Sequence, residues 1–251
     1  MSSSPNQHKP LPKPLLTRFL NYIWTNKTPK NTLNQSFFIK PESLNKWRKL
    51  SFLYNFGLLS TAFFVAPKLS TPLKYLTIWG IFSNAVYFGL VLLNKNAPNK
   101  SFGWKFTYVL GELAFAVESL VFSFFFLIIF PWMLKTRVMS NFDIFSQICL
   151  HLFAPLTIWV ETACNHLEFP KKHGIFLGIL MILYSFNNHF WTKINNKPVY
   201  PHLDWKSNKS HLIGLVCIGL SFVAYWLGNF LYKKKKAQRP NSRLSDKKSN
   251  L

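Results

Sequence analysis

The sequence predicts an all-α integral membrane protein, a bundle of six transmembrane helices. The first observation is composition: 49% of the 251 residues are apolar, with 26 Phe and 9 Trp. The second is distribution, because the apolar residues gather in windows of about 17–25 residues, the length that crosses ~30 Å of hydrocarbon. This pattern excludes the one or two soluble domains that the length alone would allow. We expect spans over residues 50–66, 72–94, 107–134, 143–161, 174–194 and 211–232.

The six windows differ in strength. The first is the weakest, since it is short and is followed at once by Ala-Pro-Lys at 66–68. The third is the clearest: its stretch SLVFSFFFLIIFPWML (119–134) carries no charge. The fourth and fifth include polar residues, which lower their hydropathy and are costly in lipid. These polar residues are therefore the natural functional candidates. Together the windows define a six-helix transmembrane domain over residues 50–232.

The two ends of the chain differ from this domain. Residues 1–49 are basic, and we expect a largely disordered cytoplasmic segment there. Within it, LLTRFLNYIW (15–24) is too short to span a membrane and fits an interfacial helix. The first fifteen residues lack the apolar core of a signal peptide, so we expect the first span to act as an uncleaved insertion signal. Residues 233–251 form a basic tail, also expected in the cytoplasm.

The net charge of +22 would suit a nucleic-acid-binding protein, but its placement does not. With six spans both ends share one side, and that side carries 22 of the 30 Lys and Arg residues, against 8 on the other. This is the positive-inside pattern, and it predicts cytoplasmic termini. The basic ends would meet anionic lipid headgroups. We expect no nucleic-acid partner and a location in the endoplasmic reticulum or another endomembrane.

Common cofactor and catalytic motifs are not found in the chain. Cys149, Cys164 and Cys217 are odd in number and have no paired spacing, so they predict neither a disulfide framework nor a zinc site. The sequence has no internal repeat, no Gly-rich phosphate loop, no HExxH and no Gly-x-Ser-x-Gly elbow. We therefore expect no metal and no cofactor.

Three polar side chains fall at similar predicted depth. Counting 1.5 Å per residue from the outer end of each span, Thr77 lies ~9 Å deep, His151 ~12 Å and His189 ~8 Å. A histidine within hydrogen-bond reach can take the proton of a threonine hydroxyl as its oxygen attacks an acyl carbon. A substrate would then arrive by lateral diffusion in the leaflet, and ester or amide cleavage in a lipid is the expected reaction.

Each of these residues also has a structural explanation. A helix threonine commonly back-bonds to a carbonyl one turn earlier. His151 could donate to a neighbouring helix, and His189 could belong to a polar cluster with Asn187 and Asn188. Depth does not fix the direction in which a side chain points, so spacing alone leaves these readings open.

Three further blocks of sequence are KYLTIWGIFSNAVYFGL (74–90), HLFAPLTIWVETACNHLEFP (151–170) and NNHFWTKINNKPVYP (187–201). Together they resemble a known family, the androgen-induced and androgen-dependent multi-pass membrane threonine hydrolases. Their order is similar over roughly residues 50–232. The resemblance implies cleavage of fatty acid esters of hydroxy fatty acids, with Thr77 as nucleophile and His151 as the essential histidine. Gln147-Ile148 and Leu152 depart from the family pattern near that histidine.

The supporting residues are less defined by the sequence. Asn84 lies two turns from Thr77 on the same helix face and is a candidate oxyanion stabiliser. Glu118 or Asp143 could orient His151, and Asn84, Glu118 and His189 are the candidate substrate contacts.

Two other functions are compatible with the same helices. The main alternative is a non-catalytic membrane protein that binds lipid or scaffolds partners. A lipid transporter is a second alternative, but paired broken helices and repeated halves, the usual signs of one, are not seen.

Overall fold

The computed structural model describes residues 23, 32–34, 36–94 and 101–237. The chain divides into two units, residues 1–30 and 31–251, and every element below belongs to the second. The interfacial helix expected at 15–24 lies outside the described residues except for Ile23, as does the end of the basic tail after Ala237.

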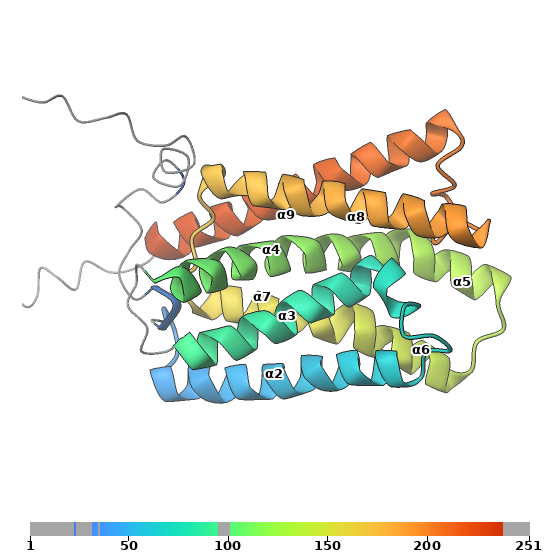
Figure 1. The fold of residues 1–251 in the computed structure, drawn as a ribbon. Coiled ribbons are helices and arrows are strands. Elements are labelled where there is room, and N and C mark those ends of the chain that lie inside the picture. Colours follow the sequence, from blue (N-terminus) through green and yellow to red (C-terminus); the bar gives the residue numbers. More distant parts are fainter. Residues whose placement is uncertain (1–22, 24–31, 35, 95–100, 238–251) are drawn as a thin grey trace, which may run out of the picture. The chain divides into compact units, whose positions relative to one another are not determined.

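The described part of the second unit contains six long helical segments, and successive segments run in opposite directions along the bundle (Figure 1). The only extended pairing in the described residues is an isolated bridge between Ser36 and Asn165, so the all-α prediction is confirmed for them. The segments are α2 (Pro41–Phe64), α3 (Leu76–Leu93), α4 (Phe102–Phe124) continued through a π-helical turn (Phe125–Ile129) into α5 (Phe130–Thr136), α6 (Asn141–Ile148) continued through a π-helical turn (Cys149–Phe153) into α7 (Ala154–Cys164), α8 (Gly174–Asn195) and α9 (Asn208–Ala237).

Four of these segments are long and apolar enough to cross a membrane: residues 76–93, 102–136, 141–164 and 208–237. This indicates a membrane protein, but the predicted count of six apolar spans is not confirmed. α2 falls short because its first turns carry Glu42, Lys46, Arg48 and Lys49. α8 falls short because its last turns carry several polar residues, namely Ser185, Asn187, Asn188, His189, Thr192 and Lys193.

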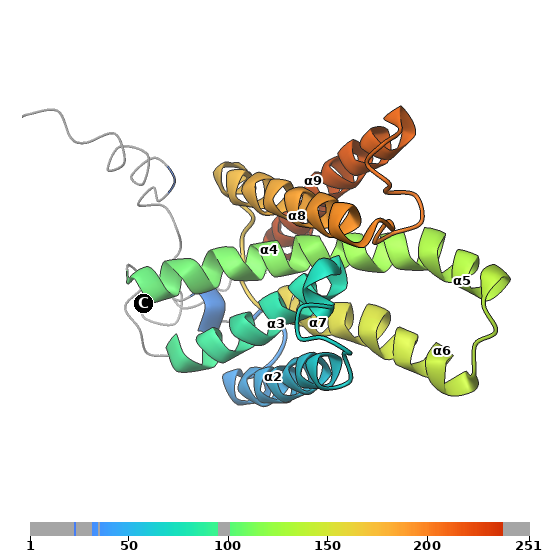
Figure 2. The ribbon, with the colours of Figure 1, turned by 45° about the vertical axis from the view of Figure 1, so that its right-hand side comes forward.

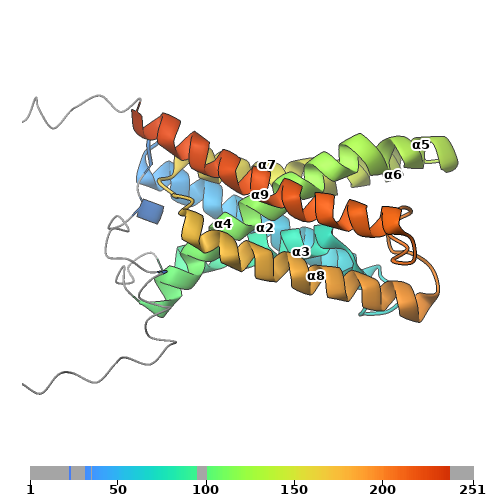
Figure 3. The ribbon, with the colours of Figure 1, turned by 90° about the horizontal axis from the view of Figure 1, so that it is seen from above.

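α4 is the central helix. It packs against α3, α7, α8 and α9, while α2 packs against α3 and α7. Figures 1 and 2 show α8 and α9 on one side of α4 and α2 and α3 on the other, and in the view from above α8 and α9 cross in front of the other helices (Figure 3). The close approach depends on small residues, as is common between membrane helices. A Cβ added to Gly111 of α4 would lie 2.6 Å from the Tyr87 ring of α3, and one added to Gly228 of α9 would lie 2.7 Å from the Phe169 ring.

α2 begins at Pro41, nine residues before the predicted span, and a buried ion pair joins this added part of the helix to α7. Arg48 is 1% exposed, and its guanidinium donates to Glu161 Oε1 over 2.7 Å. Tyr87 and Asn165 donate to the same carboxylate oxygen. Charges in such a place are paired, and removing one partner typically costs about 3–5 kcal/mol. Arg48, whose charge argues against a membrane span in the sequence, is thus part of the contact between α2 and α7.

Two further polar clusters join the helices. Glu112 receives hydrogen bonds from His173 Nδ1 (2.8 Å) and the Tyr225 hydroxyl (2.7 Å), which join α4 to the start of α8 and to α9. Lys235, at the end of α9, donates to the main-chain oxygens of Thr162 and Asn165. This lysine was expected to face lipid headgroups with the rest of the basic tail; instead it is buried at the C-terminal end of α7.

Candidate active site

Thr77 lies in the first turn of α3, at a helix start that other segments hold in place. Pro72 begins a short 3-10 turn, and Tyr75 is extended, with φ −98° and ψ 131°, so the helix begins at Leu76. The Tyr184 hydroxyl of α8 donates to the Lys74 main-chain oxygen over 3.0 Å. The Leu76 N–H, which has no partner within the helix, donates to the Tyr200 hydroxyl over 3.0 Å.

His151 lies in the π-helical turn between α6 and α7. Pro155 follows it by four residues and has no backbone N–H, so the regular hydrogen bond to the His151 carbonyl cannot form. The same arrangement occurs at the end of α4, where Pro131 follows the turn Phe125–Ile129. Such single widened turns are frequent at functional sites. The two turns face each other, and the Phe125 ring stacks on the His151 imidazole with centroids 3.5 Å apart and planes 6° apart.

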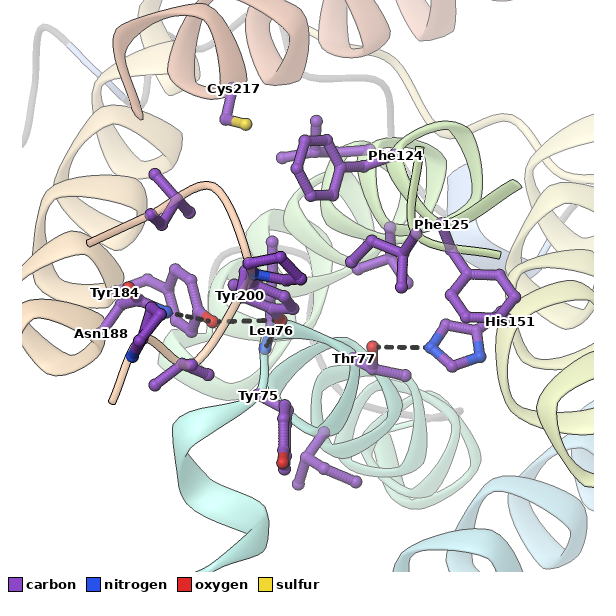
Figure 4. A pocket seen from close by; sticks show the side chains of 18 of the residues that line it. Tyr75, Leu76, Thr77, Phe124, Phe125, His151, Tyr184, Asn188, Tyr200 and Cys217 are labelled. Carbon is purple, nitrogen blue, oxygen red and sulfur yellow. Dashed lines mark hydrogen bonds between the residues drawn. The ribbon is translucent and has the colours of Figure 1, made fainter. Parts of the chain in front are cut away.

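Thr77 Oγ1 lies 3.1 Å from His151 Nε2 (Figure 4). The other ring nitrogen, Nδ1, lies 3.0 Å from the Gln147 main-chain oxygen. A carbonyl only accepts, so Nδ1 carries the imidazole hydrogen and Nε2 of the neutral ring is left as an acceptor. The threonine hydroxyl therefore donates to Nε2, which is the arrangement that a nucleophile and its general base require.

The pair opens into a cavity of about 690 Å³ between α3, α4, α5, α6, α8, α9 and the 197–205 segment. Figure 4 shows Thr77 and His151 on one side of it and Cys217 of α9 on another. Its wall is mainly apolar, formed by residues that include Leu120, Val121, Phe124, Ile129, Trp132, Met133, Leu150, Met181, Leu203 and Ile218. Its volume is in the range of small-molecule sites, and its lining suits an apolar chain.

A second polar group lines the cavity beside the start of α3. The Tyr184 and Tyr200 hydroxyls lie 3.3 Å apart. Burial of the Tyr200 phenol raises its pKa to about 12, so this side chain is neutral at physiological pH and keeps its hydroxyl hydrogen. Asn188 Oδ1 accepts a hydrogen bond from Trp205 Nε1 over 2.7 Å. Trp205 has a left-handed backbone, with φ 57°, and its N–H donates to Ser210.

The Thr77 backbone N–H has no acceptor within the described part of the chain. It is the second N–H of α3, so a helical acceptor does not exist for it. It lies on the nucleophile itself and at the positive end of the helix dipole. This N–H can therefore stabilise negative charge that develops on a carbonyl oxygen attacked by Thr77.

Two predicted supporting residues do not line the cavity. Asn84 is fully buried beneath it, and its amide nitrogen donates to Glu118 Oε1 (3.0 Å) and to the Ala154 main-chain oxygen (3.1 Å). Two helical turns separate Asn84 from Thr77, ~10 Å along the axis. Asn84 is therefore wrong as an oxyanion stabiliser, and Glu118 is wrong as a residue that orients His151 or contacts substrate.

Two more predictions fail for positional reasons. Asp143 forms a capping box with Ser140 at the start of α6, and its carboxylate accepts hydrogen bonds from the Ser140 N–H and hydroxyl. It does not reach His151, two turns further on. His189 is exposed on α8 and meets the edge of the Trp205 ring outside the cavity. Its neighbour Asn188 points inward in its place.

The sequence did not predict four parts of the site: Phe125, the Gln147 carbonyl, Tyr184 and Tyr200. The stacking of Phe125 on His151 had a signal, since a proline follows each of the two turns within an apolar run. The main-chain oxygen of Gln147 had none, because any residue supplies one.

The described residues hold no group of three or more His, Cys, Asp or Glu side chains that could bind a metal ion. All three cysteines are free thiols. In comparisons with known proteins, no family model, curated protein or solved structure matches this chain.

Proposed function

We propose that this protein is an integral membrane hydrolase of lipid esters, with Thr77 as nucleophile and His151 as general base. One observation carries the proposal: the 3.1 Å contact between Thr77 Oγ1 and an unprotonated Nε2 at the wall of an apolar cavity. The resemblance of residues 74–90, 151–170 and 187–201 to the membrane threonine hydrolases supports fatty acid esters of hydroxy fatty acids as the substrate class.

The reaction proceeds in two halves. Thr77 Oγ1 attacks the ester carbonyl carbon while its proton passes to His151 Nε2, and the carbonyl oxygen becomes an oxyanion beside the Thr77 N–H. The oxyanion collapses, the C–O bond to the hydroxy acid breaks, and His151 donates its proton to the leaving oxygen. A water then attacks the acyl-threonine with His151 again as base, and the free fatty acid and Thr77 hydroxyl are restored.

We also propose that all six helical segments cross the membrane. α2 and α8 each direct large apolar side chains outward: Leu50, Leu53 and Phe56 on α2, and Leu183, Phe186 and Phe190 on α8 are exposed. Such side chains suit contact with lipid, whereas Ser185 and Asn188 of α8 line the cavity. The distribution of Lys and Arg then favours cytoplasmic ends in an endomembrane, with the basic segments against anionic headgroups.

Hydrolysis of a long-chain fatty acid ester of a hydroxy fatty acid by the purified protein in detergent tests the function. We expect Thr77→Ala and His151→Ala each to lower kcat/KM by about 10²–10⁴-fold, the range for losing a positioned base or nucleophile. The matched controls are Thr61→Ala, an exposed threonine that back-bonds to Gly57, and His189→Ala. Both should keep the activity of the unchanged chain.

The same preparation separates the hydrolase from a lipid-binding or scaffolding protein. A scaffold would show no ester cleavage above the Thr77→Ala background while it still retained lipid or partner proteins. Activity that survives both Thr77→Ala and His151→Ala would reject this pair of residues.

A further inference from the structure

The cavity carries positive charge at one end. Arg137 and Lys197 are the only Lys or Arg side chains among its described lining residues, and no Asp or Glu is among them. A mainly apolar cavity with two cations and no acid is complementary to a long apolar ligand with one anionic end.

Local structure directs both cations to this end. Arg137 follows the last residue of α5, and its guanidinium carbon lies 5.5 Å from the centre of the Trp132 ring, a side chain that also lines the cavity. Stacking on an aromatic face leaves the planar edge of a guanidinium free to bind an anion. Lys197 comes directly after Asn196, whose left-handed backbone (φ 49°) ends α8 and turns the chain toward the cavity. Figure 1 shows the ends of α5 and α8 at the same end of the bundle.

The catalytic pair lies far from Arg137, measured along the α4–α5 segment. Phe125, which stacks on His151, precedes Arg137 by twelve residues along the α4–α5 segment. At 1.5 Å per residue this is ~18 Å, the scale of a long acyl chain. An anion bound at Arg137 and Lys197 would therefore place an ester at Thr77 only if a long apolar stretch separates the two groups.

We propose that Arg137 and Lys197 form a subsite for the anionic end of the ligand and so set the distance from that end to the bond at Thr77. This inference rests on the proposed function for its link to cleavage, but the subsite itself is a binding site. The shared chemistry is an anionic group on a long apolar chain. It can come from a free fatty acid carboxylate or from a phosphate headgroup.

Binding to the full chain in a neutral detergent tests the subsite without requiring turnover. The probes are a radiolabelled long-chain fatty acid, its primary amide and the monoalkyl phosphate of equal chain length. We expect the acid to bind about tenfold more tightly than the amide, as for a charge-assisted contact to two exposed cations. Arg137→Gln with Lys197→Gln should remove that preference. Lys135→Gln with Lys193→Gln, which change nearby cations that do not line the cavity, should retain it.

The outcomes separate the subsite from the hydrolase. A preference for the acid or phosphate over the amide that depends on Arg137 and Lys197 supports the subsite, and the tighter anion identifies its source. Equal binding of acid and amide, or a preference that survives the double variant, overturns it. The same measurement in Thr77→Ala should give unchanged affinities, so a protein with no hydrolase activity would still report on the subsite.

Discussion

At the scale of single residues, two contacts fix the His151 ring. The Gln147 main-chain oxygen accepts from Nδ1 and selects the tautomer, and the Phe125 ring covers one face of the imidazole. The carbonyl takes the place that a carboxylate holds in many hydrolase triads. A neutral orienting group avoids a further charge within the membrane, where an unpaired carboxylate would be costly.

Phe125→Leu tests the role of the stacked ring. Aromatic stacking contributes about 0.5–1.5 kcal/mol beyond its buried area, and without it the imidazole can tilt away from Thr77. We expect kcat for ester hydrolysis to fall by up to about tenfold with little change in KM. Phe126→Leu, at the next position and outside the cavity lining, is the control. An unchanged kcat in Phe125→Leu would show that the ring only fills space.

Counting along the predicted spans places Thr77 and His151 at similar depth, but it does not identify the residues around them. In the structure the two side chains meet, although Thr77 lies in the first turn of α3 and His151 lies near the middle of the segment Asn141–Cys164. Asn84 and His189 show the limit: a position along a helix follows from counting, whereas the direction of the side chain depends on which neighbours the helix meets. Asn84 faces Glu118 and His189 faces outward.

At the scale of elements, prolines shape the site. Pro131 and Pro155 each follow a π-helical turn, and these turns bring Phe125 and His151 face to face. The first turn is closed by a hydrogen bond from Phe130 N–H to the Phe125 oxygen, five residues back. The widened turn shifts the side chains after it by about a quarter of a turn relative to a regular helix.

Pro155→Ala should separate stability from activity. Alanine restores an N–H and is about 3 kcal/mol better than proline in a helix interior, so the segment can return to regular α-helix. We expect an unchanged or higher melting temperature, with ester hydrolysis reduced at least about tenfold because His151 rotates away from Thr77. Pro41→Ala, at the start of α2, is the control. Full activity in Pro155→Ala would show that the π-helical turn is not needed to place His151 beside Thr77.

The helical segments could be predicted within a few residues where they are apolar, as for 143–161 against Asn141–Cys164. The start of α2 could not, because Arg48 reads as a solvent or headgroup residue until Glu161 is known to face it. Hydropathy also does not predict the π-helical turns, because it does not depend on the missing backbone N–H of a proline.

At the scale of the whole molecule, the two ends of the bundle differ in their charged residues. The end that holds the Arg48–Glu161 pair and Lys235 is the one where α2 begins and α9 ends. The cavity opens nearer the other end, at the segments that join α5 to α6 and α8 to α9. Only four of the six segments have the length and hydropathy of a membrane span, since α2 carries charged residues and α8 has polar side chains that line the cavity.

Protease protection tests this arrangement. Both ends of the chain on one side require an even number of crossings. In sealed endoplasmic reticulum vesicles we expect tags placed before Met1 and after Leu251 both to be digested by added protease without detergent. A tag inserted between residues 137 and 140 should be digested only after detergent is added. Protection of one terminal tag would mean an odd number of crossings.

Labelling with a fluorophosphonate probe, followed by mass spectrometry of the labelled peptide, is the most direct test that Thr77 is the nucleophile. We predict a single covalent adduct on the Thr77 hydroxyl, lost in His151→Ala while the melting temperature of that variant shows a folded protein. An adduct on another residue, or labelling that persists in Thr77→Ala, would contradict the account.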